Sequence, residues 1–384
     1  MILFIDQSGQ LGGAELCLAD LAHRYREKGR VLLLSDGPFA EHLRALGVPV
    51  DLHPLPASMA RITKGASVGT LAASLPALGG YGLGLRRQLK TASLVYLNTA
   101  KALLYGTAAN LFLGKPVIFH LHDLLDETHF SPLNLRLLVG AANRADAVIA
   151  NSQATADAFV ARGGRSPVHV IPNGFDPAVA DAVSPSEVEA LRREFNPEGR
   201  PVIAIFGRLA RWKGQDVLLR AAECLPGVTL WIVGDALFTG DDHAYAEELR
   251  AMAATLKAQG GDVRFLGFRS DIPALMKAAD IVAHCSVAPE PFGRVLVEAM
   301  LAGKPLIASK AGGPTEIVAD GTTGVLVPPG DHEVLATAIR QLVDSPSLRS
   351  SMGLAGRDRA SQLYALPTVL DQTAKVIDSV LKRK

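Results

Sequence analysis

Residues 201–214 read PVIAIFGRLARWKG, and this stretch decides the fold. The run Val202 to Phe206 is apolar and partly β-branched, which is typical of a strand buried on both faces. Gly207 ends the run, and a basic turn leads into the next amphipathic stretch. A short apolar strand followed directly by a helix is the repeating unit of a parallel α/β sheet.

The same rhythm of strand and helix runs through the chain on both sides of this stretch. Other apolar runs stand at 2–5, 31–34, 94–97, 117–119, 147–150, 168–171, 230–233, 263–266, 281–283 and 306–308. Domains usually hold ~100–200 residues, so a chain of 384 residues predicts two of them. We place an N-terminal domain at 1–175, a linker at 176–200 with a helix over 186–195, a C-terminal domain at 201–365, and a final helix at 366–384 as a candidate to pack back on the N-terminal domain.

The charge and composition of the chain exclude several classes of protein. Lys and Arg number 39 against 38 Asp and Glu, for a net charge of +1, so no global field attracts nucleic acid. The 3 cysteines are widely spaced and form neither a disulfide framework nor a zinc motif. The sequence opens on an apolar run without a secretory leader, so we expect a cytoplasmic protein.

The basic turn at 207–214 is a candidate phosphate site. Ligands of open α/β sheets lie beyond the carboxyl ends of the strands, and Arg208, Arg211 and Lys213 stand at such a place. Cations and the N–H groups of a helix start both stabilise phosphate charge, so this turn can clamp a diphosphate. Basic residues in a solvated turn can equally be without function, and the turn alone does not decide between the two.

Two acidic residues follow a later strand. Glu290 stands in the loop after 281–283, and Glu298 lies about two turns into a helix that we expect to begin near Phe292. Carboxylates spaced in this way can accept hydrogen bonds from two separate groups of hydroxyls, such as those of a sugar and a ribose. The pair Gly312–Gly313 lets the backbone approach a ligand closely, although a plain turn uses glycine too.

Together these elements resemble the donor half of glycosyltransferase family 4. The matching residues are Arg208 and Lys213 (R-x4-K), Glu290 and Glu298 (E-x7-E), and the segment 311–318. The N-terminal half resembles the same family through looser motifs, which are Gly12 and Gly13, His122 and Asp123, and the segment 171–176. The resemblance covers nearly the whole chain and implies the α/β fold called GT-B, in which two Rossmann-like, doubly wound parallel-sheet domains face an interdomain cleft.

The resemblance also implies a reaction, the retaining transfer of a hexose-type sugar from a UDP- or GDP-sugar to an acceptor hydroxyl. The acceptor, whether a lipid carrier, an oligosaccharide or a small molecule, stays open. Arg208 and Lys213 would stabilise the leaving diphosphate, because that charge develops in the transition state. Glu290 would orient sugar hydroxyls, Glu298 the ribose, and His122 would contact the sugar.

The resemblance implies the following site residues. The catalytic candidates are His122, Asp123, Arg208, Lys213 and Glu290. The donor-binding candidates are Gly12, Gly13, Arg208, Lys213, Gly234, Asp235, Phe268, Arg269, Glu290, Phe292, Gly293, Arg294 and Glu298. The loops at 234–235 and 268–269 would contact the base, largely through backbone, so uridine and guanosine donors stay open.

The sequence implies no metal. His120 and His122 alternate along a strand and so face one side of it, but two histidines without a third ligand are poor evidence for a metal site. No Asp-x-Asp occurs in the chain, so Lys and Arg would neutralise the diphosphate. We expect no metal and no cofactor beyond the nucleotide-sugar co-substrate.

The segment 61–90 concerns the acceptor side. Its apolar residues Val68, Leu71, Leu75 and Leu78 recur at three- and four-residue spacing, and Arg61, Lys64, Arg86, Arg87 and Lys90 flank them. An amphipathic helix with basic flanks can make weak peripheral contact with anionic lipid at the inner face of the membrane. We favour the other interpretation, a domain helix whose apolar stripe packs on the sheet.

Two alternatives keep the same architecture: a sugar-nucleotide 2-epimerase or hydrolase, and a non-catalytic nucleotide-sugar-binding protein. The R-x4-K and E-x7-E pairs favour a transferase over both. A nicotinamide dehydrogenase is disfavoured because no G-x-G-x-x-G follows a strand. The sequence further predicts that Lys213→Ala lowers turnover and leaves the fold intact, since one charge in a surface cleft contributes little to stability.

Overall fold

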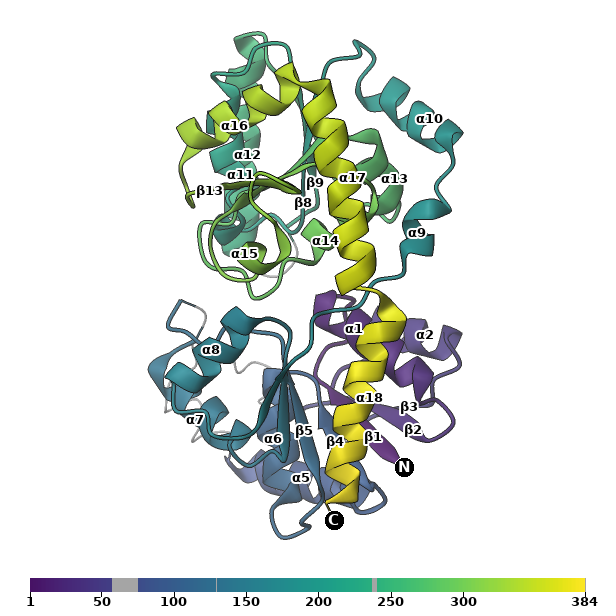
Figure 1. Ribbon diagram of the computed structural model, residues 1–384. Coiled ribbons are helices and arrows are strands. Elements are labelled where there is room, and N and C mark those ends of the chain that lie inside the picture. The colour runs from purple at the N-terminus through teal and green to yellow at the C-terminus, as the bar shows by residue number, and fades with distance from the viewer. Residues whose placement is uncertain (57–74, 129, 237–239, 384) are drawn as a thin grey trace. The chain divides into compact units, whose positions relative to one another are not determined.

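The computed structural model describes residues 1–56, 75–128, 130–236 and 240–383. The chain forms two compact units, one made of Met1–Gly174 with Pro367–Lys384 and the other of Phe175–Leu366. Each unit contains one parallel β-sheet with helices on both faces (Figure 1). The apolar strand runs in the sequence are the reason, because strands buried on both faces need continuous apolar side chains.

The first unit contains a seven-stranded sheet in the order β3-β2-β1-β4-β5-β6-β7. Its strands are β1 (Ile2–Asp6), β2 (Gly29–Leu33), β3 (Val50–Leu52), β4 (Leu94–Leu97), β5 (Val117–Leu121), β6 (Ala147–Ala150) and β7 (Val168–Val170). Every neighbouring pair is parallel. The strand order reverses between β1 and β4, and such a switch point opens a crevice beyond the carboxyl ends of the strands.

Helices cover both faces of this first sheet. They are α1 (Gly13–Arg24), α2 (Pro38–Ala45), α5 (Leu75–Lys90), α6 (Ala100–Asn110), α7 (Pro132–Ala142), α8 (Gln153–Ala161) and α18 (Leu366–Lys382). Leu3 and Ile5 of β1 pack in the core with α5 to α8, whereas Ile2 and Phe4 pack in the core with α1, α2 and α18. The final helix, yellow in Figure 1, therefore completes one face of the first sheet.

The second unit contains a six-stranded parallel sheet in the order β10-β9-β8-β11-β12-β13. Its strands are β8 (Val202–Phe206), β9 (Thr229–Val233), β10 (Asp262–Gly267), β11 (Ile281–His284), β12 (Leu306–Ser309) and β13 (Gly324–Val327). The switch point of this sheet lies between β8 and β11. The stretch that begins at Val202 thus forms one wall of the switch point.

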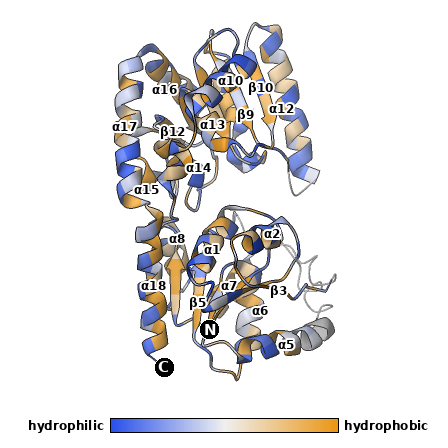
Figure 2. Cartoon of the chain, turned by 90° about the vertical axis from the view of Figure 1, so that its right-hand side faces the viewer, coloured by the Kyte–Doolittle hydropathy of each residue, from blue (hydrophilic) through white to orange (hydrophobic). Residues whose placement is uncertain are grey.

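The helices of the second unit follow the same two-sided arrangement. They are α9 (Pro177–Asp181), α10 (Pro185–Phe195), α11 (Gln215–Ala222), α12 (Gly240–Ala258), α13 (Ile272–Ala278), α14 (Arg294–Leu301), α15 (Pro314–Ile317), α16 (His332–Asp344) and α17 (Pro346–Leu363), with a 3-10 turn η1 (Arg211–Lys213). Helices α11, α12 and α16 share one core cluster, and α9, α10, α13 and α14 share the other. Figure 2 shows the result, with apolar strands such as β9 inside and helices such as α12 that are polar on one side.

The segment 176–200, assigned above to a linker, holds α9 and α10 and belongs to the second unit. A capping box starts α10, in which Ser184 accepts from the Glu187 N–H and the Glu187 carboxylate accepts from the Ser184 N–H at 2.8 Å. Ala180 and Leu191 are buried in the core of that unit. None of the described helices combines the length and the apolar character that a bilayer crossing demands.

Candidate functional site

Lys213 and Glu290 meet at the switch point of the second sheet. Lys213 follows β8 and Glu290 follows β11, and the Lys213 Nζ donates to Glu290 Oε2 at 2.7 Å. Both side chains are largely buried, with 19% and 11% of their surface exposed. The Lys213 ammonium also lies 4.1 Å from the centre of the Trp212 ring. The R-x4-K and E-x7-E motifs therefore join through one ion pair.

Two further side chains converge on the same carboxylate oxygen. Ser286 Oγ donates to Glu290 Oε2 at 3.1 Å, and His284 Nε2 lies 3.2 Å from both Glu290 Oε2 and Ser286 Oγ. Burial acts to raise the pKa of Glu290, but the charge of Lys213 and the hydrogen bond with His284 outweigh it and hold that pKa well below its usual range. Glu290 is therefore an anion held in place by three partners.

Glycines let the surrounding loops approach this carboxylate closely. Gly312 has φ +69° and Gly313 donates its N–H to the Glu290 carbonyl at 2.8 Å. A Cβ atom on Gly312 would lie 2.3 Å from that carbonyl oxygen, and one on Gly313 would lie 2.4 Å from the Phe292 carbonyl oxygen. Lack of space excludes a side chain at both places, and at Gly312 the left-handed conformation disfavours one as well.

The start of α14 holds the rest of the predicted acidic motif. The helix begins at Arg294 after Gly293, whose φ is +102°, and so starts two residues later than Phe292. Arg294 pairs with Glu298 at 3.5 Å, and partial burial raises the pKa of Glu298 against the effect of Arg294. The Phe292 side chain is buried in the core of the unit. Contact of Phe292 with a donor would therefore fall to its backbone.

The predicted base-contacting loops line the exits of β9 and β10. Gly234 donates to the Gly267 carbonyl at 2.9 Å, and the Asp235 carbonyl accepts from the Leu209 N–H at 3.0 Å. Phe268 is 73% exposed. Arg269 makes two hydrogen bonds to Asp271, at 2.8 and 2.6 Å. The exits of β8, β9 and β10 are thus connected, with an exposed aromatic ring at one end and the Arg269 guanidinium already paired.

Arg208 lies in the same loop as Lys213 but has a different partner. Its Nη1 is 3.9 Å from the Asp242 carboxylate, and 30% of its side chain is exposed. Gln215 donates to the Arg208 carbonyl at 2.9 Å and so holds the loop against the start of α11. Arg208 is thus the more open of the two basic residues of the motif.

The first unit brings His122 into a separate polar cluster at its own switch point. Asn98, directly after β4, donates to Asp6 Oδ2 at 2.7 Å, and His122 Nε2 lies 3.0 Å from Asn98 Oδ1. Asp6 ends β1, and its other oxygen accepts from the Ser8 N–H at 2.8 Å. A chain of hydrogen bonds therefore runs from a buried carboxylate through Asn98 to His122.

Gly12, Gly13 and Glu15 stand at the start of α1 beside this cluster. Gly12 precedes the helix, and a Cβ atom there would lie 2.6 Å from Glu15 Oε2. Burial raises the pKa of Asp6 to about 6, and burial with the charges of Asp6 and Asp123 raises the pKa of Glu15 to about 7. Acidic groups thus accumulate near the predicted Asp123.

His120 of β5 and His122 in the loop after it are in contact through their rings, which are tilted by 37°. The rings of His120 and His122 are 3.9 Å apart, and His120 Nδ1 shares a hydrogen bond of 2.8 Å with the buried Tyr96 hydroxyl. Burial, with help from His122, lowers the pKa of His120 well below its usual value, so this ring is neutral. Within the described part of the chain, His, Cys, Asp and Glu do not gather in any group of three or more that could hold a metal ion.

Several polar residues of these clusters were not predicted. Asp6, Asn98 and His284 each end an apolar strand or follow one directly. A systematic search for polar residues at the carboxyl ends of predicted strands would have found all three. Ser286 carries no such signal, since only the fold of its loop brings it to Glu290.

Comparison with known proteins covers both units. The family model described as "Glycosyl transferases group 1" matches residues 187–359, and the model "Glycosyltransferase Family 4" matches residues 11–179. Alpha-maltose-1-phosphate synthase of Mycolicibacterium smegmatis is 31% identical over 323 residues, which cover 78% of this chain and 82% of that protein. The crystal structure of Anabaena Alr3699/HepE with UDP and glucose is 42% identical, has a TM-score of 0.89, and the match covers 98% of this chain and 99% of that one.

Other relatives match over a shorter span. The lipopolysaccharide core biosynthesis glycosyltransferase LpsE of Rhizobium meliloti is 28% identical over 61% of this chain. That match spans 64% of the length of LpsE. A D-inositol 3-phosphate glycosyltransferase of Corynebacterium kroppenstedtii is 36% identical over 57% of this chain, and the match spans 50% of the length of that protein.

Proposed function

Because the chain belongs to the group 1 glycosyltransferases of family 4, we propose that it moves a hexose-type sugar from a nucleoside diphosphate donor to an acceptor hydroxyl, with retention at the anomeric carbon. The observation that carries this proposal is the Lys213–Glu290 pair at the switch point between β8 and β11. A fixed carboxylate and a cation beside glycine-lined loops suit a ligand that is a sugar at one end and a diphosphate at the other.

UDP-glucose is the donor that we propose first. The Anabaena HepE structures contain UDP, UDP with glucose, and UDP-glucose, and they are 41–42% identical to this chain. A GDP-mannose-dependent mannosyltransferase of Mycolicibacterium smegmatis is 32% identical over 56% of this chain and defines the second donor to test. The acceptor would be a lipid, an oligosaccharide or a small molecule of glycan, glycolipid or glycoside synthesis.

In the proposed step, the bond from the anomeric carbon to the β-phosphate oxygen breaks. The acceptor oxygen then bonds to the same face of that carbon, and its proton passes to the departing diphosphate, so atoms and charge balance. Arg208, Lys213 and the N–H groups at the start of α14 would stabilise the leaving charge. Glu290 Oε1 would accept a hydrogen bond from a sugar hydroxyl, because the three described partners of this carboxylate all contact Oε2. Glu298 stays the candidate for the ribose, and His122 for the sugar.

The first test measures nucleotide binding without added metal. The melting temperature of the protein should rise with UDP or UDP-glucose and rise less with GDP or ADP, since a ligand of the native state stabilises it. A rise in melting temperature with GDP alone would mean that the donor is a GDP-sugar and not UDP-glucose. A folded protein that responds to no nucleotide would overturn the proposal in favour of a protein that has lost the site.

The second test measures transfer. Arg208→Ala should lower turnover about 100-fold, because one preorganised charge lost from a leaving group costs this order of magnitude. Arg220→Ala, which removes an exposed arginine paired with Asp216 on α11, is the matched control and should keep activity. NMR of the product distinguishes retention from inversion. Release of free sugar, or a 2-epimer of the donor, without glycoside would support the hydrolase or epimerase alternative.

We further propose that the reaction takes place in the cytoplasm, and at the inner face of the membrane when the acceptor is a lipid. The membrane part of this placement rests on the basic character of 61–90. Residues 61–74 lie outside the described residues, and so do the side chains of 75–79.

A further inference from the structure

An exposed apolar and basic surface lies on the first unit, away from the ends of its strands that carry His122. Leu83 of α5 and Leu111 and Phe112, directly after α6, are 62%, 38% and 91% exposed. Arg86, Arg87 and Lys90 follow on α5, and Lys115 Nζ donates to the Lys90 carbonyl at 2.8 Å. We call these residues the α5–α6 surface.

Phe112 holds an unusual conformation on this surface. Its φ is +69°, and among the described residues it is the one non-glycine residue with a positive φ. A bulky side chain in the left-handed region is strained, and such strain concentrates at functional positions. With 91% of its surface exposed, the Phe112 ring faces solvent and does not contribute to the core of the unit.

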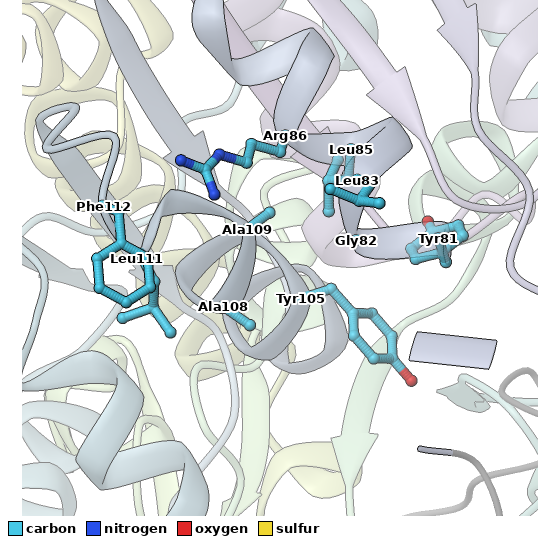
Figure 3. Close-up of a pocket in the computed structure, with 10 residues that line it drawn as sticks. All are labelled: Tyr81, Gly82, Leu83, Leu85, Arg86, Tyr105, Ala108, Ala109, Leu111 and Phe112. Carbon is cyan, nitrogen blue, oxygen red and sulfur yellow. The ribbon is translucent and has the colours of Figure 1, made fainter. Parts of the chain in front are cut away.

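Two hollows flank this ring. One, of about 330 Å³, is lined mainly by apolar side chains, including Tyr81, Leu85 and Tyr105, with Arg86 among them. Figure 3 shows Leu83 and Arg86 extending from α5, and Leu111 and Phe112 from the end of α6, around Ala108 and Ala109.

Leu111 and Phe112 also line the other hollow, together with Lys115 and Arg144. The Asp146 carboxylate also lines it and accepts from the Val117 N–H at 2.8 Å. Phe112 therefore stands between an apolar hollow and a basic one.

The stretch of sequence that forms this surface carries charges of one sign. No Asp or Glu occurs between Asp51 and Asp123, whereas the surface carries the basic residues Arg86, Arg87, Lys90 and Lys115. This bias is local, because the whole chain has a net charge of only +1. A surface that exposes aromatic and aliphatic side chains, and whose helices carry only basic charges, is complementary to the interface of an anionic bilayer.

We propose that the α5–α6 surface docks on an anionic lipid bilayer, with Phe112, Leu111 and Leu83 inserted at the boundary of headgroups and acyl chains and the basic residues on the headgroups. A protein partner of the same size would be expected to meet this surface with a continuous apolar face and would have no need for the surrounding cations. The proposal does not depend on the sugar transferred, because it concerns a surface apart from the switch points of the two sheets.

The test is sedimentation of the purified full chain with vesicles, without donor or acceptor. We expect binding to vesicles of equal parts phosphatidylglycerol and phosphatidylcholine, weak binding to phosphatidylcholine alone, and loss of binding at high salt. Phe112→Asn should lower the partition coefficient about tenfold, because the ring contributes most of the inserted apolar area. Asparagine tolerates the left-handed conformation, so this variant keeps the turn.

Charge variants and matched controls complete the test. Arg87→Gln with Lys90→Gln should weaken binding by about fivefold for each cation removed. Lys257→Gln on α12 and Leu354→Ser on α17 remove an exposed cation and an exposed leucine from the second unit and should bind as the parent does. Melting curves of all variants report whether they are folded.

Three outcomes would overturn the proposal. They are absence of binding to anionic vesicles, equal binding to both vesicle types, and binding that Phe112→Asn and the charge variant leave unchanged. Dimerisation of the parent without vesicles, abolished by Phe112→Asn, would instead identify a second copy as the occupant. Because no sugar donor is present, failure here leaves the nucleotide-binding test untouched.

Discussion

Lys213 and Glu290 form an ion pair in which both side chains are largely buried. Their side chains are 19% and 11% exposed. Lys213 is therefore not the surface charge that was expected from the sequence. Lys213→Ala would leave a carboxylate buried without its cation, and we expect it to lower the free energy of unfolding by about 3 kcal/mol. The expectation that this variant leaves the fold intact is therefore revised.

Denaturant unfolding of the second unit checks this prediction. Lys213→Ala combined with Glu290→Gln should recover part of the loss, since the uncompensated charge is gone. Lys257→Ala on α12 is the exposed control. A Lys213→Ala protein as stable as the parent would show that water reaches Glu290 in solution.

Asn98 is a positioning residue for His122 in our interpretation. It donates to Asp6 and lies 3.0 Å from His122 Nε2, so Asn98→Ala should leave the imidazole without its fixed partner. We expect kcat to fall about tenfold with the KM for donor nearly unchanged. In a His122→Ala background the same change should have no further effect on kcat, because both act through one group. Additive losses in the double variant would contradict this role.

The raised pKa of Glu15 makes the first unit sensitive to pH. A carboxyl whose pKa rises from 4.5 unfolded to about 7 folded stabilises the protonated native state. That stabilisation is complete below pH 4.5 and is lost as the pH rises through 7. Between these values we expect the free energy of unfolding of the parent to fall by about 3 kcal/mol relative to Glu15→Gln. Parallel pH profiles of the two proteins would contradict the shift.

At the scale of elements, the loop before α15 limits what can be changed near Glu290. Gly312 and Gly330 have φ of +69° and +77°, but only the first would place a Cβ atom against another residue, 2.3 Å from the Glu290 carbonyl oxygen. Alanine at either position costs about 1 kcal/mol for its conformation. Gly312→Ala should in addition displace the loop and abolish the thermal shift with nucleotide, whereas Gly330→Ala should keep it. An equal thermal shift with nucleotide in the two variants would show that the loop before α15 does not take part in nucleotide binding.

Two of the four edge strands were not predicted. These are β3 (Val50–Leu52) and β13 (Gly324–Val327), whereas the edge strands β7 and β10 were predicted at 168–171 and 263–266. An edge strand has one paired neighbour and tolerates a short or polar sequence, so its apolar signal is weak. The inner strand Val202–Phe206, by contrast, was predicted with its observed bounds.

At the scale of the whole molecule, α18 makes the end of the chain part of the first core. Ile377 is fully buried in the cluster that includes Ile2 and Phe4. Ile377→Ala should lower the free energy of unfolding by about 3 kcal/mol through lost burial and a cavity. Gln372→Ala, exposed on the same helix, should not. Denaturant unfolding followed by a probe in the first unit measures both, and equal curves would mean that α18 does not pack there in solution.

The sequence by itself determined the two doubly wound parallel sheets, and this prediction of a GT-B chain is confirmed by the two sheets and by the match to HepE. It could do so because strand length, apolar content and the turns between elements are local properties. The motifs that indicate the family are also short and local. The roles of the individual site residues stay predictions.

Only the tertiary structure decided which side chains meet. Lys213 and Glu290 are 77 positions apart, and His284 and Ser286 join them because β8 and β11 are neighbours at a switch point. Burial, and hence the lowered pKa of Glu290 and the raised pKa of Glu15, depends on every segment that excludes water from the group. Contacts between distant segments are a property of the packed fold, and no periodicity in the chain encodes them.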